Sequence, residues 1–182
     1  MLKIIKDGCI IEDTSLTISS LDQLKTLQLD TEKKALFFLL ECWQALNETE
    51  KKQLMSKHQL GLEVLNTTEP TVFADDLAYF SMIAIPFPLF TDGRGYSLAR
   101  ILREQYDFKG ELRAVGDVLQ DQLFYMKRCG FNAFVIRSDK NIEEALSSLH
   151  DFSVTYQAAT DQPLPHFRQN KMDFKTPDLG SR

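Results

Sequence analysis

The residues best suited to chemistry are concentrated in one short segment, Asp92-Gly93-Arg94-Gly95-Tyr96-Ser97, which follows an apolar run and opens a helical pattern. Gly93 and Gly95 allow unusual backbone dihedrals and a close approach of the main chain to a ligand. A helix that begins here presents unpaired N–H groups and the positive end of its dipole. Arg94 adds a full charge on a planar donor group. Together these features predict an anion site suited to sulfate, sulfite, phosphate or a carboxylate.

A simpler interpretation of the same segment stays open. Asp92 is also a good helix N-cap, in which case the glycines only shape a turn. The pattern G-x-G-x-x-G is absent because position 98 is leucine, which disfavours a dinucleotide site of the Rossmann type. Cysteine and histidine do not occur in a metal-ligand spacing, so the sequence indicates neither a metal nor another cofactor.

Two arginines on the following helix extend the candidate site. Arg100 and Arg103 share one polar stripe with Tyr96, at the spacing i, i+4, i+7. The functional interpretation is a basic wall beside the anion. The alternative is a solvated helix face on which Arg100 pairs with Glu104 at i+4.

A strand downstream contributes a further charge. Arg113 shares a strand face with Glu111, two residues away. Charges within a parallel strand are unusual, because helices or other layers normally cover both of its faces. The two side chains therefore either point into a polar site or simply pair with each other.

Polar residues in later loops and helices complete the set of candidates. Asp117 follows Gly116 and is interpreted first as a helix cap and second as a catalytic acid. Gln122 is expected on the inward side of its helix, where it would bind a ligand or satisfy a buried backbone group. Arg137 follows the last predicted strand. Because ligands bind at the carboxyl ends of parallel strands, we expect these residues and the segment at 92–97 to converge on one rim.

The elements that must position these residues alternate between strands and helices. Four strands are predicted, at residues 62–65, 82–85, 111–115 and 133–136. Each is followed by a predicted helix, beginning at Thr68, Tyr96, Val118 and Asn141 in turn. These four consecutive βα units predict an α/β fold with a parallel sheet and right-handed connections, either an open sheet or half of a (β/α)8-like barrel. We favour the half-barrel.

The chain is divided into three parts. Residues 1–30 are expected to form an N-terminal β-hairpin, with its turn at Asp7-Gly8, and a polar connector from residue 13 onward. Residues 31–157 form the α/β domain. Residues 158–182 are polar and contain prolines, so we expect them to be extended or disordered.

The start of the α/β domain is ambiguous. Residues 33–46 place Leu36, Trp43 and other apolar side chains on one helical face, which predicts a helix. The apolar run 35–40 could equally begin as a buried strand. Asn47, with Glu50 three residues later, predicts a capping box for the next helix.

The bulk composition limits the partners. The net charge of −5 and the isoelectric point near 5.2 disfavour nucleic-acid binding. The longest apolar run is far too short to cross a membrane. Three widely spaced cysteines indicate free thiols and a cytoplasmic location. The exposed edge of a half-barrel would invite pairing with a second copy, so a homodimer is expected.

Four stretches carry a family resemblance: Phe87 to Arg100, Gly110 to Val118, Asp121 to Tyr125 and Arg128 to Phe131. They resemble a bacterial domain-of-unknown-function family that carries the label of an oxidoreductase of sulfite reduction. Members are encoded near assimilatory sulfite reductase, so the resemblance implies a role in reducing sulfate or sulfite to sulfide. The family has no agreed catalytic residues, and the resemblance assigns none.

Two functions fit these observations. The first is an accessory protein of assimilatory sulfate or sulfite reduction, which binds a small anion or sulfite reductase subunits at the strand C-terminal edge. The absence of a cysteine pair and of a flavin or nicotinamide pattern favours it. The second is an enzyme of sulfite reduction, with Asp92 or Asp117 as acid–base and the arginines holding an oxyanion.

Overall fold

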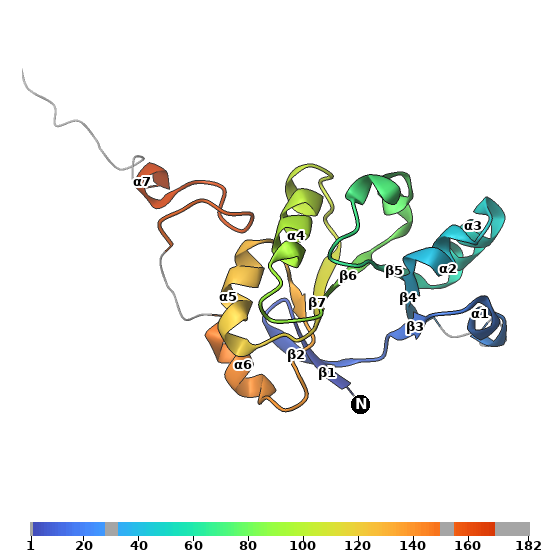
Figure 1. The fold of residues 1–182 in the computed structure, drawn as a ribbon, viewed down its shortest axis with the longest axis horizontal. Coiled ribbons are helices and arrows are strands. Elements are labelled where there is room, and N and C mark those ends of the chain that lie inside the picture. Colours follow the sequence, from blue (N-terminus) through green and yellow to red (C-terminus); the bar gives the residue numbers. More distant parts are fainter. Residues whose placement is uncertain (1, 28–32, 150–154, 170–182) are drawn as a thin grey trace, which may run out of the picture.

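An eight-stranded, mostly parallel sheet organises the chain in the computed structural model, which describes residues 2–27, 33–149 and 155–169. The sheet is strongly curled into a half-barrel, with strand order β2-β1-β8-β7-β6-β5-β4-β3 (Figure 1). The strands are β1 (Leu2–Lys6), β2 (Cys9–Asp13), β3 (Leu16–Ile18), β4 (Ala35–Leu39), β5 (Gln59–Glu63), β6 (Met82–Phe87), β7 (Glu111–Gly116) and β8 (Ala133–Phe134). Strands β3 to β8 are parallel and adjacent in chain order, which confirms the predicted α/β half-barrel.

The helices pack against the convex face of the sheet, and strand side chains line the concave face. They are α1 (Leu21–Leu27), α2 (Leu40–Gln44), α3 (Glu48–Lys57), α4 (Arg94–Glu104), α5 (Gln120–Arg128), α6 (Ile142–Ser148) and α7 (His166–Gln169), with the 3-10 helices η1 (Pro70–Val72) and η2 (Ala74–Tyr79). Ile83 and Leu112 belong to the large core that also contains Leu98 of α4 and Leu123 of α5. Alternate strand residues such as Ala84 face the concave side, because side chains alternate along a strand.

The N-terminal hairpin forms as predicted. β1 and β2 pair antiparallel around Asp7 and Gly8, both of which have positive φ, 49° and 78°. Asp and Gly tolerate these dihedrals, and the turn twists in the sense that the strands require. β1 also pairs antiparallel with β8, so the hairpin extends the parallel part of the sheet.

Two predictions for the N-terminal third were wrong in part. The connector after residue 13 contains the strand β3 and the helix α1. β3 is only three residues long, too short for a periodic signal, and its pairing with β4 defines it. The predicted helix over 33–46 divides into β4 and α2, so the apolar run is the buried strand that was the alternative. The capping box at Asn47 is confirmed.

The bounds of elements along the rest of the chain also differ from the prediction. The helix expected at Thr68 is the 3-10 helix η1, with Glu69 at its N-cap. β5 ends at Glu63, two residues before the predicted strand end. In the C-terminal part, residues 155–169 contain an isolated bridge between Ala159 and Gln162 and the short helix α7. The expectation of disorder for residues 170–182 lies outside the described residues.

The two edges of the sheet are held close together by the chain itself. β2 ends at Asp13 and β3 begins at Leu16, so only Thr14 and Ser15 separate the two edge strands. Three residue steps span at most about 11 Å. The end of β2 and the start of β3, on opposite edges of the sheet, therefore lie within about 11 Å of each other.

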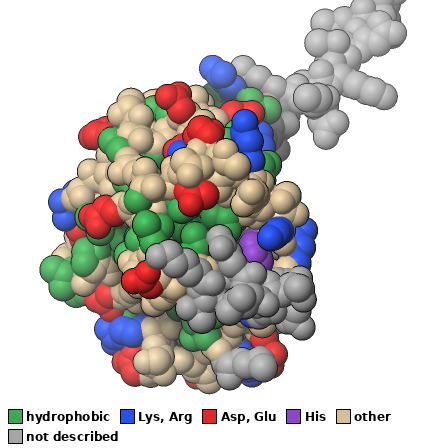
Figure 2. Space-filling view, turned by 90° about the vertical axis from the view of Figure 1, so that its right-hand side faces the viewer, with side chains coloured by type: hydrophobic (Ala, Val, Ile, Leu, Met, Phe, Trp, Pro, Cys, Tyr) green, Lys and Arg blue, Asp and Glu red, His purple; other side chains and the backbone are tan. Residues whose placement is uncertain are grey.

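The outer surface is of mixed charge. On the side near α1 and α3, acidic and basic side chains are scattered around exposed hydrophobic ones (Figure 2). Within the described part of the chain, every helix is too short or too polar to span a lipid bilayer.

Candidate functional site

The loops that follow four parallel strands meet at one rim of the sheet. Asn66, after β5, donates to Asp92 in the loop after β6 (2.8 Å). Asp117, after β7, accepts from Arg137, after β8 (2.8 Å), and its backbone N–H donates to the carbonyl of Phe87 (2.8 Å). Residues from distant parts of the chain therefore lie together at this rim, which is the arrangement predicted from the strand ends.

At the start of α4, Asp92 occupies the position where an anion was expected. Arg94 binds it with Nε to Oδ1 at 2.8 Å and Nη2 to Oδ2 at 2.6 Å. The backbone N–H of Arg94 also donates to Asp92 (3.2 Å). The Arg94 guanidinium and the Asn66 amide hold the pKa of the Asp92 carboxyl well below its usual range. The N-cap of α4 is Gly93 and no side chain caps this helix, so the simpler interpretation of Asp92 as the N-cap was also wrong.

Neither glycine of this segment needs an unusual backbone conformation, contrary to the expectation. Gly93 has φ −79° in the right-handed region, and Gly95 lies within α4. Gly95 is required for a different reason: a Cβ there would lie 2.7 Å from the ring of Phe87. At Gly93 the nearest atom to such a Cβ is 3.9 Å away, on Tyr96.

We expect Gly95→Ala to destabilise the protein by about 1–3 kcal/mol, because the added methyl group overpacks the contact with Phe87. Gly93→Ala is the matched control. It should be neutral or stabilising by up to about 1 kcal/mol, because its conformation and space accept a side chain. Urea unfolding of both variants checks the pair. Equal midpoints for the two alanine variants would contradict the packing explanation.

Arg137 is also engaged by carboxylates. Its Nε and Nη2 donate to the two oxygens of Asp139 at 2.6 and 2.9 Å, and Nη1 donates to Asp117. These two acids raise the pKa of the Arg137 guanidinium above its ordinary value, Asp139 having the larger effect. The rim therefore consists of paired charges.

Asp117 and Gln122 hold the loop between β6 and α4 in place. Asp117 accepts from the backbone N–H of Phe90 (3.1 Å), and Gln122 donates to the carbonyl of the same residue (2.9 Å). The N-cap of α5 is Leu119, so the interpretation of Asp117 as a helix cap was wrong. We call residues 88–93 the rim loop.

The rim loop presents apolar side chains to solvent. Leu89 is 62% exposed and Phe90 is 56% exposed. Leu65, at the same end of the neighbouring strand β5, is 67% exposed. Large apolar side chains grouped at one edge, on a backbone fixed at both its N–H and its carbonyl, are typical of a contact surface.

Tyr96 and Ser97 contact different neighbours of α4. The ring of Tyr96 packs between those of Phe87 and Tyr125, with both centroid distances 5.2 Å, and burial raises its pKa to about 12. Ser97 lines a 270 Å³ pocket together with Asn66 and Arg94.

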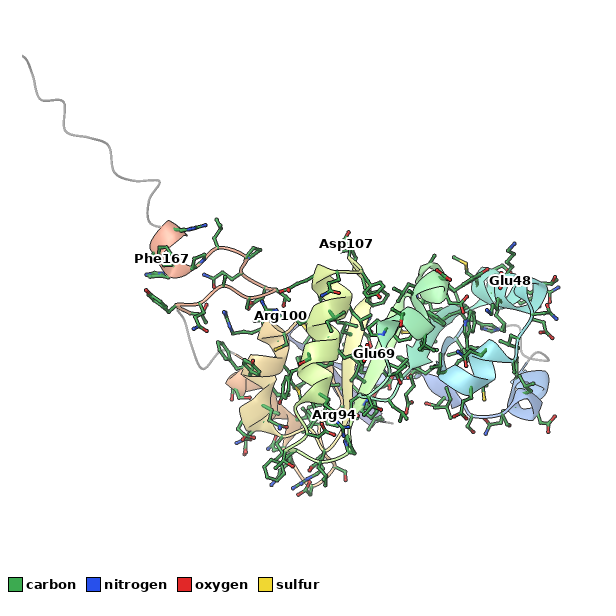
Figure 3. All side chains as sticks on the ribbon, turned by 45° about the horizontal axis from the view of Figure 1, so that its top comes forward. Glu48, Glu69, Arg94, Arg100, Asp107 and Phe167 are labelled. Atoms are coloured by element: carbon green, nitrogen blue, oxygen red, sulfur yellow. The ribbon has the colours of Figure 1, made fainter. Side chains whose placement is uncertain are left out.

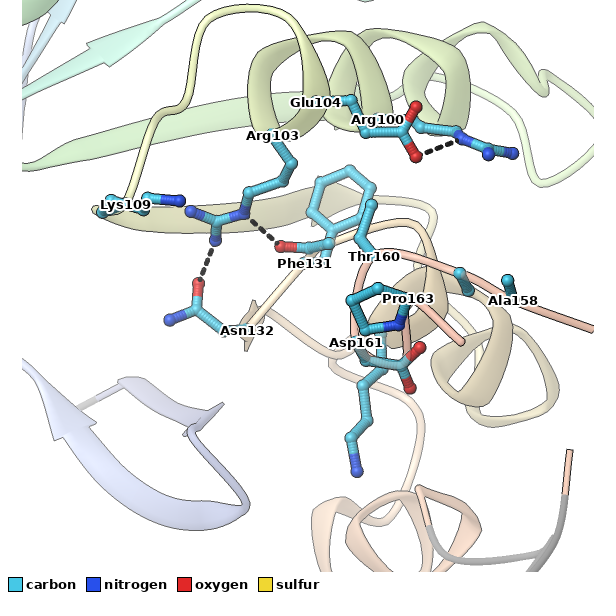
Figure 4. Close-up of a pocket in the computed structure, with 13 residues that line it drawn as sticks. Arg100, Arg103, Glu104, Lys109, Phe131, Asn132, Ala158, Thr160, Asp161 and Pro163 are labelled. Atoms are coloured by element: carbon cyan, nitrogen blue, oxygen red, sulfur yellow. Dashed lines mark hydrogen bonds and ion pairs between the residues drawn. The ribbon is translucent and has the colours of Figure 1, made fainter. Parts of the chain in front are cut away.

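Arg100 is separate from the rim. Figure 3 shows Arg94 at one end of α4 and Arg100 further along, on the side of the C-terminal segment. Its Nε donates to Glu104 (2.7 Å), which is the pairing given as the alternative. Arg100 lines a groove of 580 Å³ between α4, Lys127 and residues 158–163 (Figure 4).

Arg103 binds backbone carbonyl groups near the sheet, a role that the sequence did not indicate. Its guanidinium donates to the carbonyls of Phe108 (2.6 Å), Gly110 (2.8 Å) and Gly130 (2.9 Å) and to the side chain of Asn132 (3.3 Å). Burial lowers its pKa. The expected basic wall of Arg100 and Arg103 beside the rim is therefore not formed.

Arg113 lies on the concave face, with only 6% of its surface exposed. It donates to Glu111 (2.6 Å), and its Nη1 donates to Asp13 (2.9 Å) and Ser15 (3.0 Å). Its guanidinium also stacks on the ring of Phe37, 4.7 Å from the centroid. Arg113 thus pairs with Glu111, which was one of the two alternatives. Its other partners, Asp13 and Ser15, are about 100 residues away in the chain, so the sequence did not predict them.

The part of the chain that contains this rim matches a known protein family. Residues 61–167, more than half of the chain, match the family described as Bacterial protein of unknown function (DUF934). The chain belongs to this family. The DUF934 match includes the rim loop, Asp117, Gln122 and Arg137, and it excludes β1 to β4. A search of curated proteins found no match.

Proposed function

We propose that this DUF934 protein is an accessory protein of assimilatory sulfate or sulfite reduction, which docks a subunit of sulfite reductase through its rim loop. The observation that carries the proposal is the exposed pair Leu89 and Phe90 on a backbone fixed by Asp117 and Gln122. A fixed backbone lowers the conformational entropy that is lost when a partner binds. An exposed aromatic side chain presented in this way is typical of a residue that dominates binding energy.

The choice of a protein partner over a small anion rests on charge. The guanidinium groups of Arg94 and Arg137 are already bound by Asp92, Asp117 and Asp139. An incoming anion would be repelled by the carboxylates already bound to these guanidinium groups. The choice of sulfite reductase as the partner rests on the family resemblance of the sequence, which associates such chains with that enzyme.

An enzyme that uses the same rim is less well supported. The Arg94 guanidinium lowers the pKa of the Asp92 carboxyl below its ordinary value, and so further from neutral pH. Asp117 binds both Arg137 and the rim loop. General acid–base catalysis near neutral pH favours a group whose pKa lies close to the working pH, and Asp92 does not meet that condition.

The test is capture of sulfite reductase subunits from extracts of sulfate-grown bacteria by the immobilised full-length chain. Phe90→Ser should weaken binding by about 2 kcal/mol, or roughly thirty-fold, with stability changed by less than about 0.5 kcal/mol. Phe167→Ser is the matched control, because Phe167 is 52% exposed and lies on α7, outside the rim. Equal capture by the Phe90 and Phe167 variants, or none by the unmodified chain, would refute the proposal.

A further inference from the structure

The curled sheet encloses a cavity on its concave face that is separate from the rim loop. Its volume is 310 Å³, which lies at the lower end of the range for small-molecule sites. We call it the lumen cavity. Residues from almost every strand line it: Leu2, Asp13, Ser15, Thr17, Phe37, Glu63, Ala84, Arg113, Val115 and Val135. A cavity to which elements from the whole fold contribute is held in shape by the sheet itself.

The small side chain of Ala84, in the middle of a row of three residues, leaves room for the cavity. Glu63, Ala84 and Arg113 lie in one row across β5, β6 and β7, because Glu63 pairs with Ala84 and Ala84 pairs with Arg113. Ala84 therefore separates an acid from a base on the same face of the sheet. Phe37 and Val115 add apolar walls.

Among the described residues, the charges around the cavity do not balance. Arg113 is bound by both Glu111 and Asp13, and Lys6 pairs with the second oxygen of Glu111 (2.9 Å). These two bases and two acids neutralise one another. Glu63 remains, and within the described residues its carboxyl group forms no hydrogen bond or ion pair. Burial raises the pKa of this half-buried carboxyl, because a charged group loses hydration when it is partly removed from water.

We propose that the lumen cavity binds a small primary ammonium compound with a short apolar body, whose charged group pairs with Glu63. The ammonium group supplies the charge that the cavity lacks, and Phe37 and the valines contact its hydrocarbon part. A carboxylate ligand is disfavoured, because the guanidinium of Arg113 already has two acidic partners. This inference does not depend on the docking function of the rim loop.

The test uses n-butylammonium as the probe, in a titration of the full-length protein followed by amide chemical shifts in NMR spectra. Saturable shifts are expected for the row Glu63, Ala84 and Arg113. The uncharged analogue 1-butanol should bind at least tenfold more weakly, because it cannot pair with the carboxylate. Butyrate should cause no saturable shift in this row.

Two cavity variants, each compared with controls elsewhere, show whether butylammonium binds in the lumen cavity or at surface carboxylates. Glu63→Gln should weaken butylammonium binding at least tenfold, whereas Glu143→Gln, at an exposed acid on α6, should leave it unchanged. Ala84→Val should block binding by filling the cavity while the charges stay in place. Unsaturable shifts, or binding to the Glu63 and Ala84 variants as tight as to the unmodified protein, would overturn the proposal. Phe90→Ser should bind butylammonium normally, so this test is independent of docking.

Discussion

Replacing Arg113 by methionine is expected to lower the free energy of unfolding by about 3–5 kcal/mol, the usual result of removing one partner from a buried ion pair. Methionine approximates the length of the arginine stem but leaves Glu111 and Asp13 without their shared cation. Both acids are nearly buried, with side-chain exposures of 4% and 10%, so water cannot take the place of the guanidinium.

The measurement is urea unfolding followed by the fluorescence of Trp43, the sole and fully buried tryptophan. Lys109→Met is the control, because Lys109 is 78% exposed and pairs with the equally exposed Asp107. It should change stability by less than about 0.5 kcal/mol. Adding Glu111→Gln to the Arg113 variant should recover part of the loss. A loss below about 1 kcal/mol for Arg113→Met would contradict the buried network.

Replacing Arg103 by methionine should cost on the order of 3 kcal/mol. The guanidinium holds the carbonyls of Phe108, Gly110 and Gly130, which come from both sides of β7 in the chain. Hydrogen bonds from charged donors contribute about 1.5–3 kcal/mol each, and their loss leaves carbonyl groups without this donor. The variant therefore tests whether Arg103 joins the end of α4 to the sheet.

The control for Arg103 lies one turn earlier on the same helix. Arg100→Met removes an exposed i,i+4 pair with Glu104 and should cost about 0.5 kcal/mol or less. Differential scanning calorimetry of both variants would show the contrast as a difference in melting temperature. Similar melting temperatures for the two would show that Arg103 is a surface residue, in conflict with its position in the structure.

Local signals in the sequence were sufficient for part of the fold. The Asp7-Gly8 turn and the Asn47 capping box depend on residues that are neighbours in the chain, so their geometry follows from residue type. The alternation of strands and helices from residue 59 onward was long enough to predict the parallel half-barrel. β3 and β4 were missed or left open because their lengths of three and five residues fit more than one element, and pairing between them decides the outcome.

The site was predictable in position but not in detail. From the sequence alone, the strand-end rule predicts Asp92, Asp117 and Arg137 on one rim. It could not show that Arg94 and Arg137 turn back onto acids two residues away, since loop conformation determines such pairs. Neither Phe90 nor Glu63 is a candidate by residue type and spacing, although Phe90 lies in a stretch that carries the family resemblance. Phe90 is a candidate because it is exposed on a fixed loop, and Glu63 is a candidate because it is half-buried beside a cavity.

The most direct test of the docking account is hydrogen–deuterium exchange of the full-length chain with and without purified assimilatory sulfite reductase. Amides protected by a bound partner exchange more slowly than in the free protein. We expect slower exchange at the backbone amides of residues 89–94 and no change at residues 155–169, which contain α7. Unchanged exchange in the rim loop, or protection confined to α7, would contradict the assignment of the rim as the docking surface.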